Sequence, residues 1–265
     1  MRLYHHPLAF NARRAVMAAL ELGVPVEFIV VDLKNGEQRQ PPFLQLNPNH
    51  RVPVLQDGEF LLWESHAIMQ YLAELTPGQR LYPSAPQPRA DVNRWLFWSA
   101  YHFSPAVRDL YFERVIKSLF GRGAPDPGVI ERAELQMREL AAVLDQHLVQ
   151  RRWLSGTSLT LADLAIAAPL GVWAAAQLPI GECPGLRARG SSACRRWSPG
   201  AEALQPEPTL MRRTGAARRC APLTGAAWCR RTARRGTRAA PPPTRTARAA
   251  ADGPAPRGPP VLSPA

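Results

Sequence analysis

The chain has 265 residues and a net charge of +12, and 46% of its side chains are apolar, which is enough material for one large domain or two small ones. It contains no uncharged apolar run long enough to span a membrane, and its first residues lack the charged-then-apolar layout of a signal peptide. Composition therefore argues against membrane and secreted proteins, and we expect a cytoplasmic location.

The positive charge is concentrated near the C-terminus. Residues 1–182 carry 17 basic and 18 acidic side chains, whereas residues 183–265 carry 16 arginines and three acidic side chains. The four cysteines also lie in this second segment, and Cys183 is the first of them. A CxxC redox motif, a cysteine nucleophile and a cysteine zinc site are therefore excluded from residues 1–182, and we expect no metal in the site.

Seven segments in the first eighty residues alternate strand and helix patterns in the order β-α-β-α-β-β-α, which predicts a small domain with a mixed sheet. Gly23 is a typical stop for the first helix, and Asp57 with Gly58 predicts a type I′ turn between the last two strands. The segments are residues 2–4, 11–22, 24–33, 41–48, 52–55, 59–63 and 65–75.

Only helical patterns follow a proline-rich linker. Apolar spacing predicts long helices over residues 89–120 and 129–149. A third helix begins after Thr160, where Asp163 is well placed to complete an N-terminal cap. We therefore expect an α/β domain over residues 1–77, a linker over 78–88 and an all-α domain over 89–186.

Residues 187–265 lose this periodicity and are rich in arginine, alanine, proline and glycine. Such a composition cannot bury enough apolar surface to fold, so we expect a disordered tail. The segment lacks interleaved aromatic residues, and we do not expect specific nucleic-acid binding. Its lysine-free, arginine-rich composition suggests a reading-frame change near Arg187 in a GC-rich coding sequence, a hypothesis that reading the other frames would test.

Pro53 stands where an apolar strand should begin, and Glu64 and Ser65 stand where the next helix begins. If the bond before Pro53 is cis, the backbone groups of Val52 are left open to an extended peptide. A helix N-terminus with a hydroxyl can bind a carboxylate, although Glu64 and Ser65 also fit a simple helix cap. A ligand with a peptide-like middle and an α-amino-acid end, such as glutathione, would satisfy both places.

Three segments resemble bacterial cytosolic glutathione S-transferases, closest to the phi, theta and beta-like groups. They read LYHHPLAFNARRAVMAALEL, PFLQLNPNHRVPVLQDGEFLLWESHAIMQYLAE and WLSGTSLTLADLAIAAPL. The resemblance covers about residues 1–188. It implies a thioredoxin-like N-terminal domain with a four-stranded mixed sheet, an all-α second domain, a homodimer, and detoxifying conjugation of glutathione to a hydrophobic electrophile.

Carried over residue by residue, the resemblance implies a glutathione site around Val52 and a cis-Pro53. Val52 would pair with the cysteinyl backbone, and Glu64 with Ser65 would hold the γ-glutamyl group. The positions that would face the glycyl carboxylate or the peptide backbone are Gln38, Arg39 and Arg51.

Conjugation requires the thiol of glutathione to be held as a thiolate, usually by a hydroxyl at the start of the first helix. Similar serine-type enzymes carry that hydroxyl at position 9, which is Ala9 here. Asn11 is the first substitute, because its amide can donate a hydrogen bond from the same loop. The other candidates are the backbone amides of Phe10 and Asn11 and the side chains of Tyr4, His5 and His6.

The second substrate is expected between the first loop and the first long helix, in an aromatic environment that favours hydrophobic electrophiles. The predicted walls are Leu8, Phe10, Trp98, Tyr101, His102 and Phe112. An aromatic stripe at helical spacing also fits simple core packing. Two alternatives to conjugation stay open, namely a glutathione-dependent disulfide reductase or peroxidase, favoured by Ala9, and a non-catalytic glutathione-binding remnant.

Overall fold

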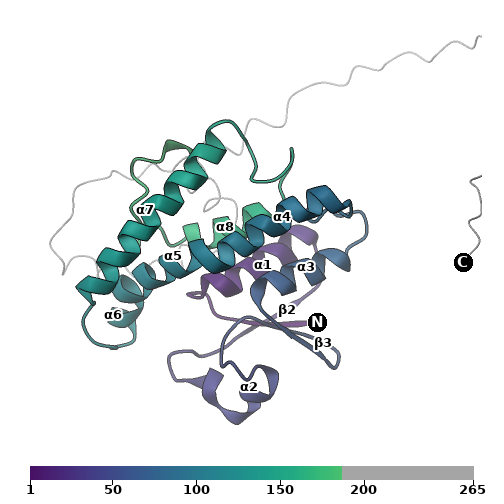
Figure 1. The fold of residues 1–265 in the computed structure, drawn as a ribbon. Helices are drawn as coiled ribbons and strands as arrows, with labels where there is room; N and C mark the ends of the chain where they lie inside the picture. The colour runs from purple at the N-terminus through teal and green to yellow at the C-terminus, as the bar shows by residue number, and fades with distance from the viewer. Residues whose placement is uncertain (187–265) are drawn as a thin grey trace, which may run out of the picture. The chain divides into compact units, whose positions relative to one another are not determined.

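The computed structural model describes residues 1–186, so the expected disordered tail and the proposed frame change lie outside the described residues. The first part folds as a four-stranded sheet with helices, as the sequence predicts (Figure 1). Its elements are β1 (Arg2–His5), α1 (Phe10–Leu22), β2 (Glu27–Val30), η1 (Glu37–Arg39), α2 (Pro41–Leu46), β3 (Val54–Asp57), β4 (Phe60–Trp63) and α3 (Ser65–Glu74).

The strands lie in the order β2-β1-β3-β4. β1 runs parallel to β2, with Leu3 opposite Phe28, because α1 crosses over between them as in other βαβ units. β1 and β3 are antiparallel, and so are β3 and β4. The sheet is therefore mixed, which confirms the predicted thioredoxin-like fold.

The predicted type I′ turn at Asp57 and Gly58 is wrong. Asp57 pairs with Phe60, so the two central residues of the hairpin are Gly58 and Glu59. Gly58 has a φ of 57°, whereas Glu59 is not among the residues with positive φ. A type I′ turn needs positive φ at both central residues, and a glycine at the first position alone is the pattern of a type II′ turn.

Helix α1 is buried on two sides, because it lies between the sheet and the helical domain (Figure 1). Ala15 and Ala19 pack toward the sheet with Leu3 and Leu55. On its other side α1 contributes to the large core of the helical domain, through Phe10, Met17 and Ala18. Leu20, near the end of α1, lies outside both cores and is half exposed, at 51%.

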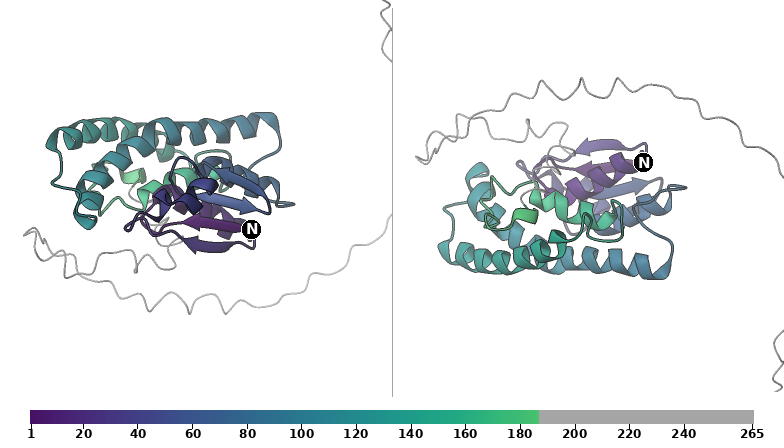
Figure 2. Two further views of the ribbon diagram at one scale, coloured as in Figure 1. Left: turned by 90° about the horizontal axis from the view of Figure 1, so that it is seen from below. Right: turned by 90° about the horizontal axis from the view of Figure 1, so that it is seen from above.

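The helical part begins with one long helical run that corresponds to the predicted helix over residues 89–120. The run contains two π-helical segments, and Pro105, which cannot donate a backbone hydrogen bond, follows the first of them. The two views in Figure 2 show the run lying beside α7. Its parts are α4 (Pro86–Trp98), η2 (Ser99–Phe103), α5 (Ser104–Tyr111), η3 (Phe112–Ile116) and α6 (Lys117–Leu119).

Helices α7 (Pro127–Val149) and α8 (Leu161–Leu170) are both capped by an aspartate. The Asp126 carboxylate accepts a hydrogen bond from the amide of Gly128 at 2.8 Å. The Asp163 carboxylate accepts from the amide of Thr160 at 2.9 Å, which confirms the predicted cap. Within residues 1–186, no helix combines the length and apolar character needed to cross a bilayer.

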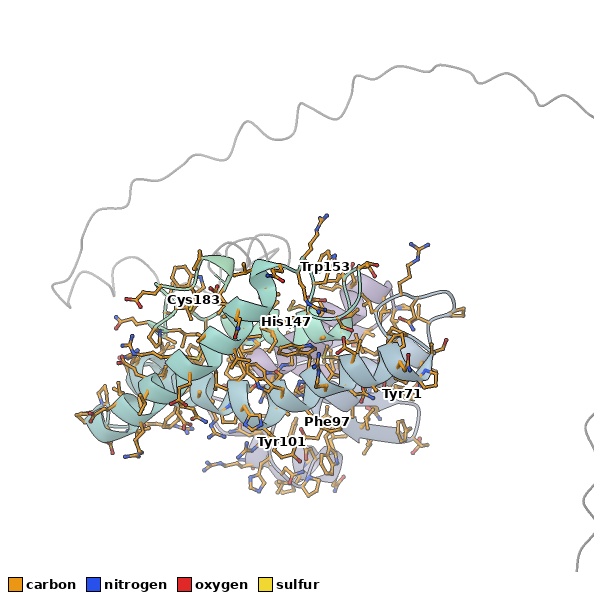
Figure 3. The ribbon with its side chains drawn as sticks, turned by 45° about the horizontal axis from the view of Figure 1, so that its top comes forward. Tyr71, Phe97, Tyr101, His147, Trp153 and Cys183 are labelled. Atoms are coloured by element: carbon orange, nitrogen blue, oxygen red, sulfur yellow. The ribbon has the colours of Figure 1, made fainter. Side chains whose placement is uncertain are left out.

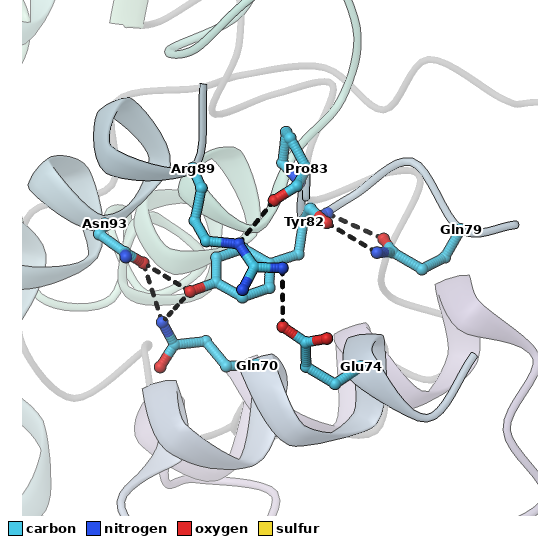
Figure 4. Close-up of polar contacts among 7 residues, drawn as sticks. All are labelled: Gln70, Glu74, Gln79, Tyr82, Pro83, Arg89 and Asn93. Atoms are coloured by element: carbon cyan, nitrogen blue, oxygen red, sulfur yellow. Dashed lines mark hydrogen bonds and ion pairs between the residues drawn. The ribbon is translucent and has the colours of Figure 1, made fainter. Parts of the chain in front are cut away.

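Tyr82 ties the segment between the two parts to α3 and α4 (Figure 4). Its hydroxyl accepts a hydrogen bond from Gln70 at 2.8 Å and donates one to Asn93 at 3.0 Å. The Arg89 guanidinium lies 4.5 Å from the centre of the Tyr82 ring and forms a 2.8 Å ion pair with Glu74. The segment is therefore fixed against both domains by side-chain contacts.

We expect the Tyr82→Phe substitution to lower the free energy of unfolding by about 1 kcal/mol, because Asn93 loses a buried hydrogen-bond donor. Urea denaturation measures the change. Ser84→Ala is the control, since it removes an exposed hydroxyl from the same segment, and it should leave the midpoint unchanged. Equal midpoints for the two variants would contradict a stabilising role for the Tyr82 hydroxyl.

Candidate functional site

A cavity of about 290 Å³ lies where the start of α1, the loop before β3 and the α5–α6 run meet. It brings together eight of the predicted site residues, namely Leu8, Ala9, Phe10, Asn11, Gln38, Arg51, Val52 and Phe112. The other lining residues are His6, Leu33, His50, Arg108, Tyr111, Ile116, Phe120 and Arg122. Sequence positions more than a hundred residues apart therefore share one cavity.

The bond between Val52 and Pro53 is cis, as expected. Strand pairing with β1 begins only at Val54, opposite Tyr4. In residues 1–186, the backbone N–H and C=O of Val52 make no hydrogen bond. The preceding loop is held by the buried Asn47, whose side-chain amide donates to the carbonyl of Arg51 at 2.8 Å. The open backbone groups of Val52 therefore lie at the cavity, next to a loop that Asn47 holds in place.

Helices α1 and α3 begin without a side-chain cap, unlike α7 and α8. The side chains of Ala9 and Glu64 do not bond the first amides of their helices, so the simple cap that was the alternative role of Glu64 and Ser65 is absent. The exposed Glu64 also has a φ of 74°, an unusual conformation for a residue with a side chain. Both helix ends therefore keep free N–H groups of the kind that bind anions.

Gln38 is 8% exposed, and its side-chain oxygen Oε1 is buried without a hydrogen-bond partner in the described residues. A buried unpaired acceptor is costly unless a ligand donates to it. Its place in the cavity wall indicates a donor such as a peptide N–H. The neighbouring Arg39 is exposed and does not line the cavity.

Arg14 is 1% exposed and was not predicted as a site residue. Its Nε donates to the carbonyl of Ala165 in α8 at 3.0 Å, and its Nη1 lies 3.4 Å from Ser65 Oγ at the start of α3. Nη2 contacts the hydroxyls of Ser99 and Ser104 in the long helical run. Burial lowers the pKa of Arg14 to about 9 while the charge of Glu64 opposes that shift, so the side chain is cationic near neutral pH.

Arg14 also fixes the orientation of Asn11. The guanidinium Nη1 lies 2.5 Å from Asn11 Oδ1, and since arginine can only donate, the amide oxygen must face it. The Asn11 side-chain nitrogen is then left as a donor at the cavity that Asn11 lines. This arrangement fits a hydrogen bond from Asn11 to an anionic sulfur.

Of the three side chains considered as alternatives to Asn11, namely Tyr4, His5 and His6, only His6 lines the cavity. Its Nδ1 accepts a hydrogen bond from the amide of Leu8 at 3.1 Å, which assigns the ring proton to Nε2. Burial lowers the pKa of His6 and favours the neutral ring. Tyr4 instead donates to Gln56 at 3.1 Å, and His5 packs edge-on against Phe28.

The helical wall of the cavity differs from the prediction. Of the four helical-domain residues expected there, only Phe112 lines the cavity. The lining residues that follow it in sequence lie in the second π segment and after α6. Trp98 instead stacks on Phe103, with the two ring centres 5.6 Å apart, and His102 is exposed. Tyr101 is 75% exposed and lies near Phe97 on the outside of the run (Figure 3). The lining residues Arg108, Phe112, Ile116 and Phe120 are spaced four apart in sequence, and this spacing is the sequence signal that could have identified them.

Two family models match the chain. One, described as the N-terminal domain of glutathione S-transferase, matches residues 1–74, and the other, described as the C-terminal domain, matches residues 127–198. Within residues 1–186, no three His, Cys, Asp or Glu side chains form a group that could hold a metal ion.

The chain is similar to named glutathione S-transferases in sequence and structure. It is 37% identical to glutathione S-transferase 3 of Zea mays over 62% of this chain and 73% of that protein. The theta-class enzyme of Xanthomonas axonopodis pv. citri, solved with glutathione bound, is 34% identical, with a TM-score of 0.65 over 74% of this chain and 95% of that one. The F7 enzyme of Populus trichocarpa is 25% identical, with a TM-score of 0.69 over 77% and 99%.

His66 follows Ser65 in α3, and its Nε2 is buried without a partner in the described residues. Burial, followed by the charge of Arg14, lowers the pKa of His66 to about 3. The unfolded chain takes up a proton at this histidine near pH 6.5, whereas the folded chain stays neutral, so stability should fall as the pH drops from about 6.5 toward 3.

We expect His66→Gln to remove a slope of up to about 1.4 kcal/mol per pH unit from the free energy of unfolding between pH 6 and 4. Denaturant titrations at several pH values measure the slope, which does not depend on the absolute stability of the variant. His102→Gln, at an exposed histidine, should keep the wild-type slope. If both variants show the wild-type slope, His66 is not held neutral.

Proposed function

Because the chain belongs to the glutathione S-transferase family, we propose that this enzyme conjugates glutathione to a hydrophobic electrophile at the cavity between α1, the Val52–Pro53 loop and the α5–α6 run. The single observation that carries the proposal is the open backbone of Val52 beside two uncapped helix ends. Three further expectations stay predictions: that the enzyme belongs with the bacterial phi-, theta- and beta-like members, that it is cytoplasmic, and that it acts in detoxification.

We assign glutathione binding to residues 1–77 and the second-substrate wall to residues 89–186, with residues 78–88 as the linker. The backbone of Val52 pairs with the cysteinyl unit, as a strand edge pairs with a peptide. The free amides of α3 and the hydroxyl of Ser65 bind the γ-glutamyl carboxylate, and exposed Glu64 binds its ammonium group. Gln38 accepts from a peptide N–H, and the nearby guanidiniums of Arg39 and Arg51 face the glycyl carboxylate.

Asn11 donates through its side-chain nitrogen to the glutathione sulfur and favours the thiolate, together with the free amides at the start of α1. The sulfur then attacks an electrophilic carbon. A carbon–sulfur bond forms, the bond to the leaving group breaks, and the leaving group departs with the electron pair, as chloride does from a chloroaromatic compound. The thiol proton goes to solvent. The apolar body of the electrophile lies against Leu8, Phe10 and Phe112.

A glutathione-dependent disulfide reductase or peroxidase is the second candidate, and Ala9 in place of a serine is the observation that favours it. In these reactions two glutathione thiols reduce a disulfide to two thiols, or a peroxide to an alcohol and water, and leave as oxidised glutathione. Relative turnover of a chloroaromatic compound and a small disulfide distinguishes the two reactions. A third candidate, a non-catalytic glutathione-binding remnant, predicts retention on immobilised glutathione with turnover of neither.

We expect Asn11→Ala to raise the pKa of bound glutathione by about one unit, equivalent to ~1.4 kcal/mol. The value of kcat/KM for a chloroaromatic electrophile near neutral pH should fall roughly tenfold as a result. Ultraviolet absorbance of the bound thiolate and the pH–rate profile measure the two effects. Asn11→Asp keeps the size and the contact with Arg14 but cannot donate, so it should lose at least as much.

Ala9→Ser restores the hydroxyl of similar enzymes and should shift the thiol pKa in the opposite direction. All three variants should still be retained on immobilised glutathione, because none removes the backbone of Val52. An unchanged pH–rate profile in Asn11→Ala would exclude Asn11 as the donor and leave His6 and the backbone amides.

We also propose a homodimer, supported by apolar side chains that this protomer leaves exposed. Phe97 and Tyr101, one turn apart on the long run, are 62% and 75% exposed (Figure 3). Phe60 and Trp63 on the edge strand β4 are 49% and 41% exposed. Exposed apolar patches of this kind are typical of protein interfaces.

Light scattering coupled to size-exclusion chromatography should give the mass of a dimer for the wild type. The double variant Phe97→Ser, Tyr101→Ser should shift toward the monomer. Leu135→Ser, which changes a 64%-exposed residue on α7, is the matched control and should stay dimeric. A wild-type monomer would overturn the proposed assembly.

A further inference from the structure

Three arginines, Arg51, Arg108 and Arg122, line the cavity, and no aspartate or glutamate lies among its lining residues. The two histidines in the wall, His6 and His50, add no formal negative charge. The cavity is therefore cationic, although residues 1–182 as a whole carry slightly more acidic than basic side chains. A site of this kind attracts anions.

These guanidiniums have few partners of their own. Elsewhere in the described residues, arginines such as Arg89 and Arg114 pair with carboxylates. Within residues 1–186, the side chains of Arg51 and Arg122 form no ion pair or hydrogen bond. The Arg122 guanidinium lies 5.7 Å from the centre of the Phe120 ring, a contact that leaves its N–H groups unpaired. Both guanidiniums thus keep their donors for a ligand.

Arg108 has one partner, the adjacent Asp109. Its Nε and Nη2 both lie 2.9 Å from the same oxygen, Asp109 Oδ1, in an exposed pair. Exposed ion pairs contribute little because water screens them. Asp109 is not a cavity-lining residue, so it does not compensate for Arg108 at the cavity surface.

The arginines divide between the two walls of the cavity. Arg51 comes from the loop before Val52, on the wall that the proposed function assigns to glutathione. Arg108 lies in α5 and Arg122 in the loop after α6, so in sequence they flank the apolar lining side chains Tyr111, Phe112, Ile116 and Phe120 of the helical domain. Glutathione accounts for Arg51 and leaves two guanidiniums beside an apolar surface.

We propose that the preferred second substrate is an amphipathic organic anion, with an apolar body that carries the electrophilic carbon and a carboxylate or sulfonate group that Arg108 and Arg122 bind. This inference rests on the proposed function and specifies its substrate class. Guanidinium groups match planar carboxylates and sulfonate oxygens in geometry and charge. The apolar side chains between the two arginines hold the body against the thiolate.

Two electrophiles of nearly the same shape test the inference, namely 4-chloro-3-nitrobenzoate and its neutral amide, 4-chloro-3-nitrobenzamide. In both, the glutathione sulfur replaces chlorine, which leaves as chloride with its electron pair. The value of kcat/KM for each is divided by the rate constant of its uncatalysed reaction with glutathione. We expect the wild type to prefer the carboxylate by roughly tenfold or more, and less at high salt.

The variants Arg108→Gln and Arg122→Gln should each reduce this preference by roughly three- to tenfold, and the double variant should abolish it. The preference is a ratio between the two substrates, so a loss of fold or of the thiolate, which lowers both rates equally, leaves it unchanged. Retention on immobilised glutathione shows that each variant is folded. Arg94→Gln is the matched control, because Arg94 is an exposed arginine in α4 that lies outside the cavity.

Turnover of the amide without a preference for the carboxylate would overturn the inference and leave the proposed conjugation standing. A preference that survives in the double variant would assign the anion to other groups and also overturn it. If neither compound is conjugated although glutathione is retained, the conjugating function fails, and the inference fails with it.

Discussion

The buried guanidinium of Arg14 is the interaction on which the arrangement of the site depends. A buried charge is costly unless hydrogen bonds surround it, and here α8, α3 and the long helical run each supply an acceptor. These acceptors come from both parts of the fold, so they are satisfied only when α1 lies in one position between the sheet and the helices. The same guanidinium turns the amide of Asn11 toward the cavity. One side chain therefore couples the packing of the two domains to the geometry of the site.

Departures from regular structure cluster around the same region. The π segment η2 supplies Ser99 to Arg14, and η3 turns the helical wall so that Phe112 and Ile116 face the first loop. π-helical turns inside long helices often accompany functional sites. The uncapped helix ends, the open backbone of Val52 and the unpaired oxygen of Gln38 add polar groups that the protein itself leaves unsatisfied. Natural folds satisfy nearly all buried polar groups, so these unpaired groups support the proposal of a ligand at the cavity.

Local signals were enough to predict most of the fold. Periodicity, Gly23 and the Thr160–Asp163 pair predicted the order of elements and the cap of α8, because each depends on residues close in sequence. The cis bond before Pro53 was also predictable, since Pro53 belongs to a short motif at the start of a strand. The role of Arg14 was not, because its contact with Ala165 joins residues 151 positions apart. Trp98, Tyr101 and His102 do not line the cavity, and ideal helical spacing does not account for the shift in phase that a π segment introduces.

Glu64 illustrates how stability and function can oppose each other in this fold. Its positive φ and the missing cap on α3 both raise the free energy of the ligand-free protein, and a glycine there would adopt the same backbone more easily. Selection for heat resistance alone would therefore favour a glycine at position 64 and would remove the carboxylate that we propose binds the tripeptide. Engineering of this enzyme for robustness is better directed at surfaces such as α7, where the Asp126 cap is already in place.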